Sequence, residues 1–142
     1  MSNFWKTWMQ IWCWGVILFG AVLAGGAFPA TDAAVRTLYS ILGGAPATPE
    51  MFDAPGMRFS VGLMGAVTLG WGATILGLLP AIHQAGAPAW RGLTLALAIW
   101  FVIDGAISVA TGYGLNNLPN TALAALYFIP VLTTGVLKRS AG

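Results

Sequence analysis

Charged residues are scarce in this chain. Six lysines and arginines and four aspartates and glutamates make up 7% of its 142 residues, whereas 58% are hydrophobic. An ordinary soluble domain is about one quarter charged, so this sequence lacks the polar groups needed to cover a globular surface. The six basic residues are scattered along the chain, which excludes the concentrated positive surface typical of nucleic-acid binding. We therefore expect the lipid bilayer, and no nucleic acid, as its partner.

Cysteine and histidine occur once each, as Cys13 and His83. A single cysteine cannot form a disulfide within the chain, and no cluster of cysteine and histidine has the spacing of a metal site. A haem held by two histidines of one chain is likewise excluded. No nucleophile–base pair, paired carboxylates or glycine-rich phosphate loop is found. We expect no catalytic residues, no metal and no cofactor, and hence a protein that is not an enzyme.

Long apolar stretches dominate what is present. A membrane-spanning helix needs about 20 apolar residues, and we expect four spans, at residues 4–27, 58–82, 90–112 and 119–137. The fold class predicted is all-α, an integral membrane four-helix bundle that forms a single transmembrane domain over residues 1–142. A cleaved signal peptide is the alternative for the first stretch, which is longer and richer in tryptophan than such peptides. Trp5 and Trp8 are expected to anchor this span at the lipid headgroups.

A short amphipathic helix is predicted over residues 31–42, between the first and second spans. Its apolar face follows the i, i+3, i+4, i+7 spacing and consists of Val35, Leu38, Tyr39 and Leu42. Thr31 is expected to cap the helix, Asp32 and Arg36 to pair at i, i+4, and a glycine pair to end it. The pattern predicts a helix at the membrane interface.

Lysine and arginine positions predict the orientation of the four spans. One side carries two basic residues, Arg36 and Arg58. The other carries four, together with His83, and these are Lys6, Arg91, Lys138 and Arg139. Because cytoplasmic loops carry the excess of lysine and arginine, both termini are expected on the cytoplasmic side.

Asp104 is the only ionisable residue well inside an expected span. A carboxylate at that depth is costly and normally faces other helices with a partner. Counting from the turn between the third and fourth spans, we expect Tyr127 at the depth of Asp104, with Ser108 one turn away and Arg58 within reach. This polar cluster indicates either a clasp between helices or an outward-facing pocket for a proton, an ion or a small ligand.

Small residues recur every four positions in the second span, at Gly62, Ala66 and Gly70. Such a row lets another helix approach closely. A second row contains Gly65 and Gly72. We expect packing within this chain, with self-association as the alternative.

One segment and the general layout carry a family resemblance. An outer amphipathic stretch is followed by Arg58, which opens a glycine-patterned span, Met57-Arg-Phe-Ser-Val-Gly-Leu-Met-Gly-Ala-Val-Thr-Leu-Gly-Trp-Gly72. In this the chain resembles the DoxX-like group of small four-helix bacterial membrane proteins. The resemblance implies a bacterial inner-membrane location and carries over Arg58 alone. Some members of that group are associated with quinol oxidation or thiol-linked stress systems.

Three functions are compatible with these features. The leading interpretation is a non-enzymatic accessory or binding subunit that associates with other membrane subunits or a hydrophobic ligand. The second is a small proton-coupled or solute transporter that uses Asp104. The third is a subunit of a quinone-linked oxidoreductase.

Overall fold

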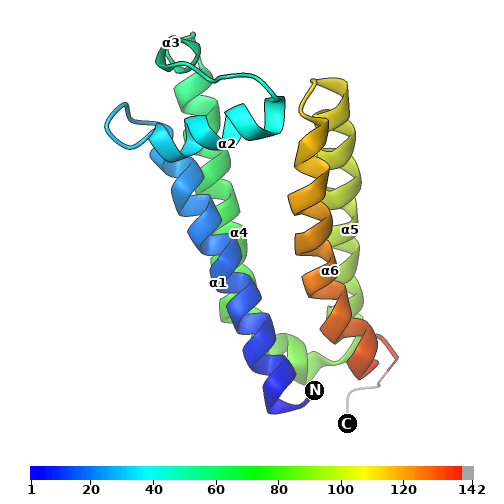
Figure 1. The fold of residues 1–142 in the computed structure, drawn as a ribbon. Coiled ribbons are helices and arrows are strands. Elements are labelled where there is room, and N and C mark those ends of the chain that lie inside the picture. The colour runs from blue at the N-terminus through cyan, green and yellow to red at the C-terminus, as the bar shows by residue number, and fades with distance from the viewer. Residues whose placement is uncertain (139–142) are drawn as a thin grey trace. The chain divides into compact units, whose positions relative to one another are not determined.

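The structure is a computed structural model that describes residues 1–138, so Arg139 lies outside the described part. Over these residues the chain is helical and contains no strand, which confirms the all-α fold class. The elements in chain order are α1 (Asn3–Gly25), α2 (Ala33–Gly43), α3 (Pro49–Phe52), α4 (Met57–Ala85), α5 (Ala87–Ala110), the short 3₁₀ helix η1 (Gly114–Asn116) and α6 (Asn117–Thr134) (Figure 1).

Three helices within residues 1–138 are long and apolar enough to cross a membrane, namely α1, α4 and α5, with 23, 29 and 24 residues. They correspond to the first three expected spans and support a membrane protein. Helix α6 is shorter, with 18 residues, and its first turn contains Asn117 and Asn120, which lower its apolar character. A fourth span, and with it a four-helix bundle, therefore stays a prediction.

The connections between helices are tighter than the sequence suggested. Helix α4 continues through Pro80 to Ala85, and only Gly86 separates it from α5. Gly86 has a φ of 71°, a conformation that glycine adopts without the steric cost of a side chain, and Pro88 lies in the first turn of α5, where no backbone donor is lost. Likewise the helical structure after α5 resumes at Gly114 instead of Pro119.

The described chain forms two compact units. The first consists of Met1–Trp12 together with the chain from Ile75 onward, and the second of Cys13–Thr74. Helices α1 and α4 each contribute residues to both units. In the first unit α5 and α6 lie side by side as an antiparallel hairpin (Figure 1).

In the second unit α1 and α4 pack closely through glycines. A Cβ added to Gly65 would lie 2.1 Å from the backbone nitrogen of Ala24, and one added to Gly20 would lie 2.4 Å from that of Leu69. A Cβ on Gly62 would lie 2.8 Å from the Cβ of Ala27. Backbone-to-backbone approach of this kind is the usual way in which membrane helices associate.

The expected row Gly62, Ala66 and Gly70 is therefore correct only at Gly62. Ala66 and Gly70 are exposed, and a Cβ on Gly70 would meet nothing within 4 Å. The contact follows the other row, since Gly65 and Gly72 both face α1. Small residues repeat both every four and every seven positions along α4. Their spacing in the sequence does not show which of these two rows faces α1.

Helix α2 is amphipathic as predicted, with bounds close to the expected 31–42. Val35 is buried in a small apolar core with Leu23, Phe52 and Val61. Gly44 ends the helix in the left-handed conformation. The expected cap is wrong, because the Thr31 hydroxyl donates to the Gly25 carbonyl 2.6 Å away and Asp32 occupies the cap position without a side-chain cap bond.

A first prediction concerns the α1–α4 contact. Gly65→Ala should lower the free energy of unfolding by about 1–3 kcal/mol, because the added methyl group meets backbone and forces the two helices apart. Gly70→Ala is the matched control and should be neutral or stabilising, since alanine is the better helix former. Thermal unfolding of the detergent-purified chain measures both. Equal effects of the two substitutions would contradict this packing.

Candidate functional site

A cluster of polar side chains surrounds Asp104 near the C-terminal end of α5. The carboxylate Oδ1 accepts hydrogen bonds from Asn116 Nδ2 at 2.9 Å, from Asn120 Nδ2 and, at 3.4 Å, from the Ser108 hydroxyl. Asn116 Nδ2 also lies 3.0 Å from Ser108 Oγ. The four side chains thus form one connected network, in which Ser108 and Asn120 are buried.

The α5–α6 hairpin brings these residues together. Asp104 lies six residues before the end of α5, and Asn120 lies three residues after the start of α6. The two helices are joined by a turn that includes the 3₁₀ helix η1, on which Asn116 lies. The connection therefore folds Asn116 and Asn120 back over the carboxylate.

Tyr127 does not bond to Asp104 as expected. Its hydroxyl lies 2.9 Å from that of Thr94, ten residues before Asp104 and thus about 15 Å away along α5 at 1.5 Å per residue. The expected depth was counted from Pro119, whereas helical structure already resumes at Gly114. This earlier start brings Asn120, two turns before Tyr127, to the level of Asp104.

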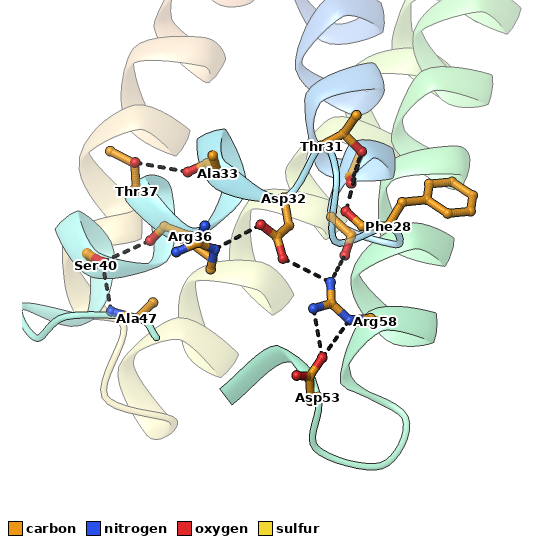
Figure 2. A network of polar contacts seen from close by, with 12 residues as sticks. Phe28, Thr31, Asp32, Ala33, Arg36, Thr37, Ser40, Ala47, Asp53 and Arg58 are labelled. Carbon is orange, nitrogen blue, oxygen red and sulfur yellow. Dashed lines mark hydrogen bonds and ion pairs between the residues drawn. The ribbon is translucent and has the colours of Figure 1, made fainter. Parts of the chain in front are cut away.

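Arg58 is bound to two aspartates within the second unit (Figure 2). Its Nε and Nη2 donate to Asp53 Oδ1 at 3.0 and 2.8 Å, and its Nη1 donates to Asp32 Oδ2 at 3.0 Å. Asp32 Oδ1 accepts from Arg36 Nε at 2.9 Å, which is the expected i, i+4 pair. The guanidinium of Arg58 thus ties the start of α4 to the segment before α2 and to the end of α3.

Asp32 is the residue that the sequence did not identify as central. It is only 2% exposed, and its two oxygens bind two different arginines. The hydrogen bond from Arg36, followed by that from Arg58, lowers the pKa of Asp32, because donation to the charged form favours ionisation. The i, i+4 spacing of Asp32 and Arg36 was the signal in the sequence that could have identified Asp32. Its second partner, Arg58, is 26 residues away and is brought to Asp32 only by the fold.

Two tryptophans of α1, Trp8 and Trp12, donate hydrogen bonds to α6 within the first unit. Trp8 Nε1 donates to the Leu126 carbonyl at 2.8 Å, and Trp12 Nε1 donates to the Leu123 carbonyl at 3.0 Å. The Leu126 carbonyl would normally accept from residue 130, but Pro130 has no N–H. Trp8 therefore satisfies a backbone acceptor that proline leaves free, a role beyond the expected headgroup anchor. The expected anchor Trp5 packs against Trp8 with ring centroids 5.7 Å apart.

His83 lies near the end of α4. Its Nδ1 lies 2.6 Å from the Leu79 carbonyl, and its ring packs edge-on against Trp90 with centroids 5.2 Å apart. Within residues 1–138 no group of three or more histidine, cysteine, aspartate or glutamate side chains could hold a metal ion. The polar cluster around Asp104 is therefore the strongest candidate site.

Comparison with known proteins adds no relative: no protein-family model, no curated protein and no solved structure matches this sequence.

A second prediction tests the bond from Trp8. Trp8→Phe should destabilise the chain by about 1 kcal/mol, the usual net value of a hydrogen bond, because the Leu126 carbonyl loses its donor. In a Pro130→Ala background residue 130 regains its N–H, so Trp8→Phe should cost measurably less. A double-mutant cycle of thermal unfolding gives this coupling. Trp5→Phe is the control, and an equal cost of Trp8→Phe in both backgrounds would contradict the assignment.

A third prediction concerns Asp32 and pH. Because the pKa of Asp32 is lowered on folding, its ionised form stabilises the chain above the unfolded pKa of about 4. That stabilisation is lost as the pH falls through the folded-state pKa. Asp32→Asn should therefore lower the melting temperature at neutral pH and flatten its decline on acidification.

Asp53→Asn is the control for Asp32, since it also removes a carboxylate bound to Arg58. The side chain of Asp53 is 64% exposed, so water compensates for much of the lost ion pair and the change in melting temperature should be smaller. A pH profile of Asp32→Asn that parallels the wild type would show that Asp32 does not contribute.

Proposed function

We propose that this chain is a small multi-pass protein of the bacterial inner membrane, of the DoxX-like kind. It crosses the bilayer four times and acts as a non-enzymatic accessory or binding subunit. Its partners are other membrane subunits or a hydrophobic ligand held between helices. Both termini face the cytoplasm.

The hairpin geometry supports α6 as the fourth span. Hydrogen bonds from Asn116 and Asn120 to Asp104 fix α6 antiparallel to α5, so a chain that crosses the bilayer in α5 returns along it in α6. At 1.5 Å per residue the 18 residues of α6 cover about 27 Å, close to the hydrocarbon thickness of about 30 Å. Leu126, Ile129 and Leu132 are exposed along α6, as expected for a surface that faces lipid.

The limited extent of the polar cluster argues against a transport path through the α5–α6 hairpin. Below Asp104, the α5 residue buried next is Leu97, which is fully covered, and the next polar contact is the isolated pair of Thr94 and Tyr127. A path for a solute or a proton needs polar groups that continue across the span. A polar site bounded by apolar packing instead holds its own groups in place.

A fourth prediction tests the topology. Reporter fusions after Gln84 and at the C-terminus should both report the cytoplasm, and a fusion near Ala47 should report the outer side. The reason is the excess of lysine and arginine on the side that carries Lys6 and Arg91. A C-terminus on the outer side would show that α6 does not cross the membrane and would refute the proposal.

The accessory role is tested by purification in a mild detergent, followed by mass spectrometry of intact complexes. A second membrane subunit or a hydrophobic ligand should be present in a fixed ratio to the chain. The alternative of a small proton-coupled or solute transporter is favoured by one observation, the carboxylate of Asp104 within a candidate span. Solute flux by the chain alone in liposomes, abolished by Asp104→Asn, would establish that alternative instead.

A further inference from the structure

We propose that His83 is a pH-sensitive latch between the end of α4 and the start of α5. In the neutral form its ring stays packed on Trp90 and bonded to Leu79, and protonation displaces the ring and loosens the end of α4. The observation that carries the proposal is the ring nitrogen Nε2, which is buried and has no hydrogen-bond partner among residues 1–138.

The partner of Nδ1 determines where the ring proton lies. Nδ1 is 2.6 Å from the carbonyl oxygen of Leu79, and a carbonyl oxygen only accepts hydrogen bonds, so Nδ1 carries the proton. In a neutral imidazole the other nitrogen is then an unprotonated acceptor. Acidification therefore adds its proton at Nε2, the nitrogen that protein atoms enclose.

A proton on Nε2 would create a charged donor with no acceptor beside it. A buried donor without an acceptor is costly, and an unpaired buried charge costs more. His83 lies in the last turn of α4, where the helix dipole favours a cation, but this effect is modest compared with the burial of an unpaired charge. Because the side chain as a whole is only partly buried, rotation of the ring brings the imidazolium to the surface.

The first unit has no acid close enough to compensate the imidazolium in place. Among residues 1–138 its other titratable and charged groups are the N-terminal amine, Lys6, Arg91, Asp104, Tyr113, Tyr127 and Lys138. The only carboxylate of this set is Asp104, fourteen residues beyond Trp90 and thus about 21 Å along α5. The remaining groups are positive or neutral at physiological pH, so none of them favours a charged ring.

The ring of His83 joins the two helices at their junction. It packs edge-on against Trp90 with ring centroids 5.2 Å apart, and Trp90 is only 1% exposed. Only Gly86 separates α4 from α5, so this contact connects the last turn of one helix to the first turn of the next. Displacement of the ring therefore removes a side-chain contact across the junction.

The bond from Nδ1 also stabilises a helix end that Pro80 weakens. Pro80 lies within α4 and has no N–H, so the Leu76 carbonyl lacks the bond that residue 80 would normally donate. The bond from Nδ1 to the Leu79 carbonyl lies directly after this gap. Its loss, when the ring leaves, frees the end of α4 that follows Pro80.

The side of the membrane to which the latch responds rests on the proposed function. With both termini in the cytoplasm, the α4–α5 junction faces the cytoplasm too, and the latch opens when that compartment becomes acidic. The latch itself does not depend on the orientation of the chain.

The direct test is nuclear magnetic resonance of the full-length chain in detergent, with ¹⁵N-labelled histidine. His83 is the only histidine, so the label reports one ring. At a pH of about 7.5 the ring should be neutral with its proton on Nδ1. Titration to about pH 5.5, across the range in which histidine changes its charge, should produce the imidazolium and abolish the nuclear Overhauser effect between the His83 and Trp90 rings. A proton on Nε2 at the higher pH, or an imidazolium that keeps its contact with Trp90, would overturn the proposal.

Thermal unfolding provides a second test through His83→Asn, which keeps an N–H donor near the position of Nδ1 but does not titrate. Carboxylates stay ionised between about pH 7.5 and 5.5. Over this range the melting temperature of the wild type should fall by several degrees, and that of His83→Asn should stay nearly constant. Gln84→His added to His83→Asn is the matched control: it places a histidine at an exposed position and should not restore the dependence on pH.

Equal declines of the wild type and His83→Asn would refute the latch. If His83→Asn does not fold, the resonance titration of the wild type decides. The proposed function fails separately, because neither measurement involves the topology. A chain whose reporters place the C-terminus outside, but whose ring behaves as described, keeps its latch and loses only the proposed orientation.

Discussion

Lipid offers no hydrogen bonds, and this constraint determines how the polar groups of the chain are arranged. Each polar group within a long apolar helix has to find its partner inside the protein. Threonines meet this demand locally, since the hydroxyls of Thr68, Thr111 and Thr134 each donate to the carbonyl four residues earlier. The carbonyl freed by Pro130 instead takes a distant donor, the indole of Trp8. One proline in α6 thereby fixes where α1 contacts it.

The apolar lipid environment also explains why glycines determine the contact between α1 and α4. Lipid tails are as apolar as leucine, so burial of large side chains gives membrane helices little reason to associate. Close backbone approach adds dispersion contacts instead, and Gly20 and Gly65 permit it at facing positions. The exposed face of α4, by contrast, carries large residues such as Phe59, Leu63 and Val67, as suits contact with lipid.

The sequence predicted the parts of the structure that depend on local pattern. The lengths of α1, α4 and α5, the apolar face of α2 and the Asp32–Arg36 pair follow from apolar run length, helical period and i, i+4 spacing. The predictions from sequence were wrong where they depended on the register between two helices. Tyr127 was predicted beside Asp104 because the last helix was expected to start at Pro119. Helical structure starts earlier, at Gly114. Asn120, two turns before Tyr127, therefore bonds to Asp104 instead. The partner of Arg58 was missed for a similar reason: Asp32 is 26 residues away in sequence.

Asp32 and Asp104, which are buried and partly buried, have different kinds of hydrogen-bond partners. Asp32 lies outside the long helices and receives two guanidinium groups, so its charge is compensated and its bonds join three segments of chain. Asp104 lies within a long apolar helix and receives only neutral donors. Neutral donors orient a carboxylate but leave its charge in place. A carboxylate paired with two guanidinium groups is a tie between segments through ion pairs, whereas Asp104 joins α5 to the turn and to α6 through hydrogen bonds from neutral groups alone.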